Sequence, residues 1–257
     1  MSYYVGIDMG SCYCKCVIIK DNNIEVKSIN QIEGNPKEAS KNVMNKALGT
    51  LNLKFKNIKN CVSIGRNRKK IPYKNKEESE IKCIAKGVIK LIPSIRTIVD
   101  LGSLTNKAIK LNSNGKVIDY VINDKCASGS GMFLELVAKA LEMDITEVGK
   151  NAGKSENPLS ITSQCSIFAE SEVIYLVNEG ENENDIAAGV SNSIASRTYS
   201  LLKRVNMEKE IILTGGVANN SQIRRKLEER LEFKLKNPSI DPIFIAAYGA
   251  ALYASEI

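Results

Sequence analysis

The chain has 257 residues, of which 43% are hydrophobic and 25% charged, a balance typical of a globular protein with one large domain or two smaller ones. The absence of histidine excludes Ser–His–Asp and Cys–His catalysis and His-ligated metal sites. The net charge of +7 comes from lysines spread along the chain, without tryptophan, so we expect a solvated basic surface and no nucleic-acid partner.

Membrane and redox signals are weak or absent in the sequence. No stretch approaches the roughly 18 apolar residues of a membrane span, and residues 1–10 lack the basic and apolar regions of a signal peptide. Seven cysteines without regular spacing argue against a disulfide framework and favour a reducing compartment. We therefore expect a cytoplasmic protein with no membrane contact.

Two series of elements of the same kind are predicted along the chain. Each begins with a strand that ends in an aspartate, Asp8 or Asp100, about 92 positions apart, and continues with a glycine–serine turn, two strands and a helix. Two such halves facing each other would put both aspartates in one cleft. The predicted strands cover residues 3–8, 12–20, 24–29, 97–100, 106–111 and 116–122, and the helices residues 37–48 and 132–143.

The remaining pattern completes an α/β protein of two domains. A helix over 81–92, ended by Pro93, connects the two series. We expect domains at 1–93 and 94–257 in tight contact, with the last helix able to pack back on the first domain. The further predicted elements are helices over 166–178, 186–205, 220–231 and 242–254, and a strand over 210–216.

The segment around the first aspartate fits a phosphate-binding hairpin. A strand delivers the carboxylate of Asp8, and the small residues Gly10 and Ser11 let backbone N–H groups and a hydroxyl approach phosphate oxygens. Lys15 adds a positive charge on the following strand. A glycine–serine turn alone is commonplace, so this hairpin needs support from elsewhere in the chain.

A second hairpin of the same kind supplies that support. It contains Asp100, Gly102, Ser103 and Thr105, and further on a strand ends in a diglycine where backbone can lie against an adenosine. There is no GxxxxGK[ST] and no GxGxxG, so neither a P-loop nor a Rossmann site is predicted. The diglycine segment consists of Gly215, Gly216 and Val217.

Two cysteines suggest a second chemistry. Cys126 and Cys165 each precede a predicted helix, whose positive N-terminal end lowers a thiol pKa and favours an anionic cluster. A [4Fe–4S] cluster takes four thiolates, so two per chain point to a cluster shared across a twofold dimer. The alternative is that both are small buried hydrophobic residues. For Cys12, Cys14 and Cys16 on one strand, and for Cys61 and Cys83, we expect core packing.

The ordered set GIDMGS, DLGSLT and LTGGV resembles the superfamily of acetate kinases, Hsp70 chaperones, actin and sugar kinases. The resemblance implies an α/β fold of two ribonuclease-H-like, actin-like ATPase domains with a nucleotide cleft between them. It further implies that ATP or ADP is bound with Mg²⁺, and that Asp8 and Asp100 hold the metal and the attacking water.

A closer resemblance covers nearly the whole chain. The segments NDKCASGSGMFL, SQCSIFAESEV and GGVANN are similar to those of the activator ATPases of 2-hydroxyacyl-CoA dehydratases and the ATPase subunits of benzoyl-CoA reductases. This implies an oxygen-sensitive homodimer with one [4Fe–4S] cluster bridged by Cys126 and Cys165 of both subunits. ATP would drive an electron, supplied by ferredoxin or flavodoxin, into a partner iron–sulfur dehydratase or reductase.

The second hairpin departs from the family pattern and keeps other functions open. The family usually has DIGGQD where this chain has DLGSLT, which bears on the rate of hydrolysis. Two alternatives are a cluster-free small-molecule kinase of the same superfamily and a regulatory module switched by nucleotide binding. A bound iron–sulfur cluster separates the first hypothesis from both.

Overall fold

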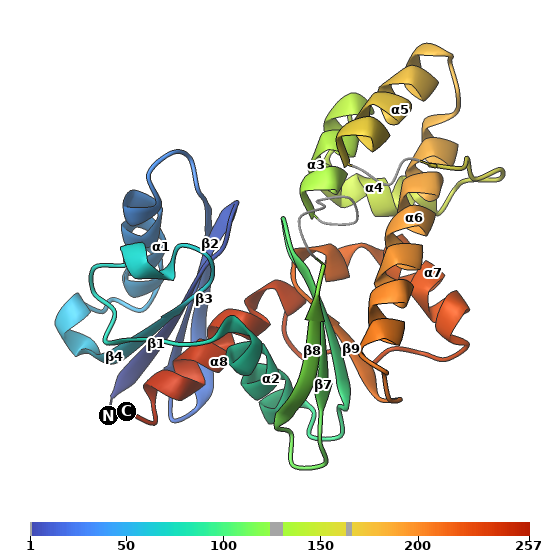
Figure 1. The fold of residues 1–257 in the computed structure, drawn as a ribbon. Helices are drawn as coiled ribbons and strands as arrows, with labels where there is room; N and C mark the ends of the chain where they lie inside the picture. Colours follow the sequence, from blue (N-terminus) through green and yellow to red (C-terminus); the bar gives the residue numbers. More distant parts are fainter. Residues whose placement is uncertain (1, 124–130, 163–165) are drawn as a thin grey trace. The chain divides into compact units, whose positions relative to one another are not determined.

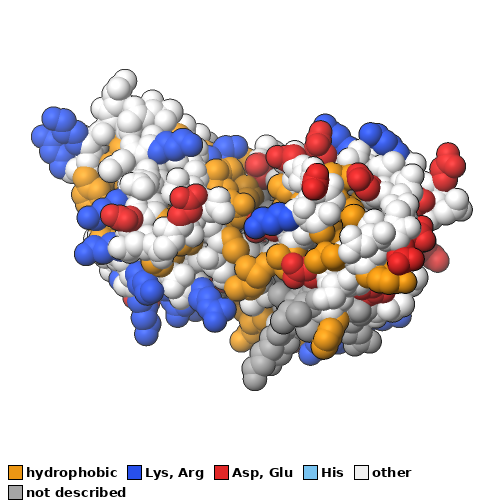
Figure 2. Space-filling model, turned by 90° about the horizontal axis from the view of Figure 1, so that it is seen from above, with side chains coloured by type: hydrophobic (Ala, Val, Ile, Leu, Met, Phe, Trp, Pro, Cys, Tyr) orange, Lys and Arg blue, Asp and Glu red, His pale blue; other side chains and the backbone are white. Residues whose placement is uncertain are grey.

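The computed structural model describes residues 2–123, 131–162 and 166–257 (Figure 1). The chain forms two compact units. The first consists of residues 1–95, 111–117 and 238–257, and the second of residues 96–110 and 118–237. On the face shown in Figure 2, Lys and Arg side chains are spread among uncharged ones rather than gathered in one patch. Within the described part of the chain, no helix combines the length and apolar character needed to cross a bilayer.

The first unit is built on a five-stranded sheet with the order β3-β2-β1-β4-β5. Strand β1 pairs antiparallel with β2 and parallel with β4, and β2 pairs antiparallel with β3. The register places Asp8 of β1 opposite Lys15 of β2. The strands are β1 (Tyr3–Met9), β2 (Tyr13–Lys20), β3 (Asn23–Gln31), β4 (Ile58–Ile64) and β5 (Lys76–Glu77).

Helices cover both faces of this sheet, since the alternation of side chains along its strands gives it two apolar faces. One face packs on α1 (Pro36–Thr50), which begins after the N-cap Asn35, whose side chain accepts a hydrogen bond from Lys37 N. Residues of the other face, such as Val17 and Ile19, pack on α8 (Ile245–Ala254), and α8 also packs on α2 (Glu80–Leu91). The 3₁₀ helices are η1 (Phe55–Asn57), η2 (Arg68–Lys70) and η4 (Pro242–Phe244).

The second unit repeats this strand order in a four-stranded sheet, β8-β7-β6-β9. Here β6 pairs antiparallel with β7 and parallel with β9, and Asp100 lies opposite Lys107. One large apolar core joins the sheet to its helices. The elements are β6 (Thr97–Leu101), β7 (Asn106–Leu111), β8 (Val117–Ile122), α3 (Gly131–Ala140), α4 (Ile145–Ala152), α5 (Ser166–Asn178), α6 (Glu183–Arg204), β9 (Ile211–Thr214), η3 (Gly216–Asn219) and α7 (Ser221–Leu231).

The repeated order of three strands and a helix is confirmed in both units. The strands β4 and β5, the helix α4 and the 3₁₀ helices η1, η2 and η3 were not predicted. The helix expected to reach Met143 ends at Ala140 because Glu142 takes a left-handed φ of 51°, and the helix expected from Pro242 begins as the 3₁₀ turn η4. The expected core packing is confirmed for the buried thiols of Cys14, Cys16, Cys61 and Cys83, whereas Cys12 is only partly buried.

Candidate functional site

The first candidate hairpin joins β1 to β2. The backbone N–H of Gly10 donates to the Tyr13 carbonyl at 3.1 Å, which closes a short turn that leaves Gly10 and Ser11 partly exposed. A Cβ on Gly10 would lie 2.9 Å from Tyr13 O and 3.3 Å from Lys15 Nζ, so glycine at this position lets the turn close. This geometry suits the contact with phosphate oxygens that the sequence predicts.

At the base of this hairpin lies a buried ion pair. Lys15 Nζ lies 2.9 Å from Asp8 Oδ2, and both side chains are largely shielded from solvent. The second carboxylate oxygen, Asp8 Oδ1, is buried and has no hydrogen-bond partner within the described residues. A buried carboxylate oxygen is costly without a partner, so Asp8 Oδ1 suits a bound cation or a water molecule.

A third segment supports this hairpin, and sequence reasoning missed its role. The loop after β4 brings Gly65 so close that an added Cβ would lie 2.7 Å from Asp8 Oδ1, and Gly65 has a left-handed φ of 89°. The next-but-one residue, Asn67, donates from its backbone N–H to Met9 O at 3.2 Å and from its side chain to Gly10 O at 3.4 Å. The only sequence signal was the glycine after a buried strand.

The second hairpin has the same construction as the first. Gly102 N donates to Thr105 O at 3.1 Å, and Gly102, Ser103 and Thr105 are partly exposed. The carboxylate of Asp100 is again paired, with Lys107 Nζ 3.1 Å from Oδ2. The exposed fractions of the two side chains are 6% and 8%, so this pair is buried.

Lys107 was not among the predicted site residues, although the repeat contains the signal for it. Lys15 follows Asp8 by seven positions, and Lys107 follows Asp100 by the same seven. Thr214, at the end of β9, was missed too, and its hydroxyl donates to Asp100 Oδ1 at 2.9 Å. Aligning the two repeats residue by residue would have revealed the lysine, but not the threonine from a distant strand.

The diglycine segment lies beside the second hairpin. Gly215 has a φ of 85°, and a Cβ on it would lie 2.3 Å from Leu101 O, so only glycine fits there. Helix α3 begins at the same place, since Gly131 N donates to Gly102 O at 2.8 Å. The exposed Gly216 and the buried Val217 form the start of η3. The second unit thus gathers its hairpin, the diglycine and a helix start.

The cysteines divide into two groups. Burial raises the pKa of Cys14, helped by the nearby Asp8 carboxylate, and burial raises the pKa of Cys61, each to about 12. Burial likewise raises the pKa of Cys16 and Cys83, so these four remain neutral thiols near neutral pH. Cys126 and Cys165, the predicted cluster ligands, lie outside the described residues. Among the residues that the structure describes, no three potential ligands come together as a metal site.

The chain matches the model of the BadF/BadG/BcrA/BcrD ATPase family over residues 5–254. It belongs to this family. It is 39% identical to the 2-hydroxyisocaproyl-CoA dehydratase activator of Clostridioides difficile, covering 98% of this chain and 94% of that protein. It is also 38% identical to the activator of lactoyl-CoA dehydratase of Anaerotignum propionicum, covering 99% and 98%.

Structural comparison agrees with the family assignment. The activator of the 2-hydroxyisocaproyl-CoA dehydratase from Clostridium difficile with bound ADPNP superposes with a TM-score of 0.94 at 38% identity, covering 99% of this chain and 94% of that one. The predicted α/β fold of the actin-like ATPase type and the resemblance to dehydratase activators are therefore confirmed.

Proposed function

We propose that this chain is an ATP-dependent reductive activator, a cytoplasmic homodimer that uses ATP to transfer an electron to a partner iron–sulfur dehydratase or reductase. The observation that carries the proposal is the pair of matching hairpins, each with a buried Asp–Lys pair behind an exposed Gly–Ser turn. Membership of an ATPase family and the ADPNP-bound relative support nucleotide binding.

Within this proposal each hairpin has a role toward the nucleotide. The N–H groups of Gly10 and Gly102 close the two turns, and the lack of a side chain at both positions lets phosphate oxygens approach the hydroxyls of Ser11, Ser103 and Thr105, which bind them. Lys15 neutralises phosphate charge while orienting Asp8. The backbone of Gly215, Gly216 and Val217 lies against the adenosine. The same proposal includes a boundary between the two domains at residues 93–94 and a nucleotide cleft between these domains.

Magnesium fits the carboxylates that the chain provides. The buried, unpartnered Asp8 Oδ1 is a hard oxygen ligand of the kind Mg²⁺ prefers, and Asp100 is the matching carboxylate of the second repeat. When bound, the ion would neutralise charge that develops on the transferred phosphoryl group. Asp8 and Asp100 are the residues we propose to hold it and to orient the attacking water.

The iron–sulfur part of the proposal rests on the motifs around Cys126 and Cys165, and on the burial and raised pKa values of most of the other cysteines. Four of the seven cysteines are buried core residues whose raised pKa values make them poor ligands. Cys12 is partly exposed but belongs to the turn before β2. Cys126 and Cys165 remain, and two such thiolates from each of two copies match the four that a [4Fe–4S] cluster requires.

The decisive experiment measures iron and acid-labile sulfide on protein purified without oxygen, together with an EPR spectrum after dithionite reduction. We expect about two irons per chain, lost in Cys126→Ser and in Cys165→Ser but retained in the matched variant Cys12→Ser. ATP-dependent reduction of a 2-hydroxyacyl-CoA dehydratase, with reduced ferredoxin or flavodoxin as donor, tests the partner.

Two results would argue against this function. A protein that binds ATP but holds no iron after anaerobic reconstitution would leave a nucleotide-switched module or a kinase. Release of ADP that depends on a small acceptor molecule, with formation of a phosphorylated product, would identify the kinase.

A further inference from the structure

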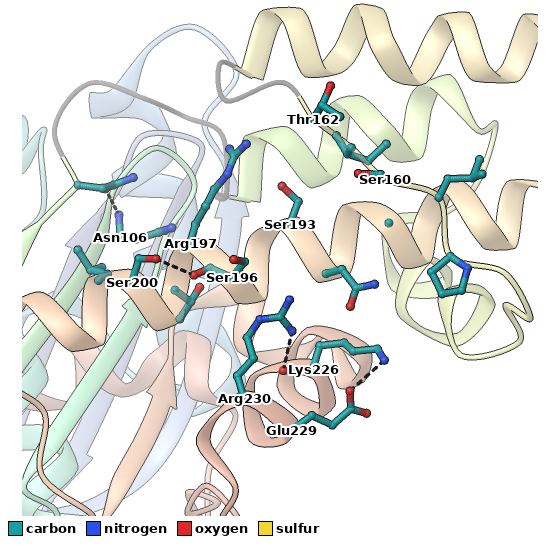
Figure 3. Close-up of a pocket in the computed structure, with 18 of the residues that line it drawn as sticks. Asn106, Ser160, Thr162, Ser193, Ser196, Arg197, Ser200, Lys226, Glu229 and Arg230 are labelled. Carbon is teal, nitrogen blue, oxygen red and sulfur yellow. Dashed lines mark hydrogen bonds and ion pairs between the residues drawn. The ribbon is translucent and has the colours of Figure 1, made fainter.

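The second unit contains a polar groove. Its volume is about 880 Å³, and it lies between α6, α7 and the segment 158–162 (Figure 3). None of the glycines, serines or aspartates of the two hairpins lines it, and neither does the diglycine. The groove therefore has a lining of its own, which comes nearest to the second hairpin at Asn106, the residue after Thr105.

The helical repeat of α6 creates one wall. Ser193, Ser196 and Ser200 follow one another at spacings of three and four residues, which places them on one face of the helix. The opposite face, including Ala195 and Leu202, is buried in the core of the unit. Figure 3 shows the three serines along α6 with Arg197 beside them. Ser200 Oγ already donates to the Ser196 carbonyl at 3.1 Å, so the hydroxyls that this wall can offer to a ligand as donors are those of Ser193 and Ser196.

The charges around the groove are mostly positive. Four cationic side chains line it and one carboxylate, Glu229. This carboxylate is already engaged, since it lies 2.9 Å from Lys226 Nζ and 3.6 Å from Arg225 Nε. The four lining cations are Arg197, Arg204, Lys226 and Arg230.

Two of these arginines have capacity left for a ligand. Arg204 is exposed and makes no ion pair with any described carboxylate. Arg230 donates from Nη1 to the Lys226 carbonyl at 3.3 Å, and it too lacks an ion pair within the described part of the chain. A guanidinium has five N–H donors in a planar fork that fits phosphate oxygens, so most donors of both side chains stay available.

We propose that this groove binds a small molecule bearing phosphate groups, at a site distinct from the nucleotide. Arginines and hydroxyls together are the donor set that recognises phosphate. The volume lies within the roughly 300–1,000 Å³ typical of small-molecule pockets. No aromatic side chain occurs among the described lining residues, whereas protein interfaces rely on aromatic anchors, so a small anion fits better than a docked protein.

The test is calorimetric titration of the complete protein with inorganic pyrophosphate, in phosphate-free buffer and with the nucleotide site saturated by ADP. We expect one saturable site whose affinity falls at least tenfold in the double variant Arg204→Gln, Arg230→Gln. The matched control is Lys203→Gln, Lys209→Gln, which removes two exposed charges of the same unit outside the groove and should bind as the parent does.

ADP affinity, measured in the same variants, should stay unchanged in all of them, which separates this site from the proposed nucleotide function. The proposal is overturned by the absence of saturable binding, by equal affinity in the arginine variant, or by an equal loss in the lysine control, which would indicate general charge attraction. Binding of a polyglutamate peptide without binding of pyrophosphate would also overturn it, in favour of an acidic protein partner.

Discussion

At the scale of single residues, the recurrent feature is an aspartate neutralised by a lysine seven positions further on. In both units the pair is buried, with exposed fractions between 6% and 13% for the four side chains. Removing one partner of a buried pair leaves an uncompensated charge, which costs about 3–5 kcal/mol. Each lysine therefore keeps an ionised carboxylate in place at the base of a hairpin.

The Lys107→Met variant should be strongly destabilised because Asp100 would keep its buried charge without a counterion. We expect the free energy of unfolding to fall by roughly 3–5 kcal/mol, measured by urea denaturation of the second unit. The control is Lys110→Met, three residues further on, whose partner Glu208 is 53% exposed, and it should cost less than about 1 kcal/mol. Equal losses in the two variants would show that Lys107 acts only through packing.

The Asp8→Asn variant should fold but lose ATP hydrolysis. Asparagine keeps the shape of the side chain but removes the charge that we propose for the metal, so we expect kcat to fall by at least about 10²-fold. Turnover of ATP at saturating Mg²⁺ measures the loss, and a melting curve checks that the protein is folded. Asp21→Asn, in the exposed turn between β2 and β3, should hydrolyse ATP as the parent does. Normal turnover in Asp8→Asn would remove Asp8 from the mechanism.

The buried thiols predict a loss of stability at alkaline pH. Burial raises the pKa of Cys14 and of Cys61 to about 12, above the unfolded value of about 8.5. Their contribution is therefore fully present below about pH 8.5 and is lost as the pH rises toward 12. We expect unfolding free energy to fall with a slope of up to about 1.4 kcal/mol per pH unit for each thiol.

Denaturation curves between pH 7 and 10.5 measure this slope. Cys61→Ala should give a shallower dependence than the parent because it removes one titrating thiol, whereas Cys12→Ala, at the partly exposed position, should not. A stability that stays constant up to pH 10.5 would contradict the assigned burial of these thiols.

At the scale of elements, α8 can reach the sheet and α2 because small residues line it. Gly249 of α8 faces α2 so closely that an added Cβ would lie 1.8 Å from Cys83 O, and Gly87 of α2 would meet Ile245 O at 2.5 Å. On its other side α8 faces Gly6 of β1, where a Cβ would lie 2.0 Å from Ala247 O. These contacts are with backbone, which cannot move aside as a flexible side chain does.

Gly249→Ala should therefore force α2 and α8 apart. We expect a loss of about 1–3 kcal/mol or more in unfolding free energy, the usual cost of overpacking. In the control variant, we expect the unfolding free energy to rise instead of fall. Gly49→Ala lies in the last turn of α1 with nothing within 4 Å of the added Cβ, so it should gain up to about 1 kcal/mol from helix propensity. Thermal melts of both variants measure these changes in stability. An unchanged stability of Gly249→Ala would mean that α2 and α8 are not packed this closely.

Periodicity and capping signals made most elements predictable. The helix over 166–178 was assigned with its observed bounds, and α2 within one residue at each end. Helix α4 was missed although Asp144 caps it by accepting from Thr146 N, because its eight residues give too short an apolar pattern. The strand β4 was missed because it ends at Ile64 and is followed by Gly65, without the aspartate that marks the ends of β1 and β6.

At the scale of the whole molecule, the sequence predicted the two repeats and both hairpins, but not how distant segments support them. Asp8, Gly10, Asp100 and Gly102 stood out because each lies in a short local motif. Thr214 and Asn67 act through contacts across the fold, and no local pattern marks such contacts. Lys107 falls between these cases, since only comparison of the two repeats reveals it.

The proposed shared cluster predicts that oligomeric state follows iron content. One chain has a mass of 28.2 kDa, so light scattering of the protein purified without oxygen should give twice that mass. Exposure to air should convert the dimer to single chains as the iron is lost. Cys126→Ser should be monomeric from the start, whereas Cys12→Ser should behave as the parent. Each form should still bind ADP with similar affinity, because the hairpins belong to one chain. A Cys126→Ser protein that remains dimeric without iron would show that protein contacts, and not the cluster, hold the two copies together.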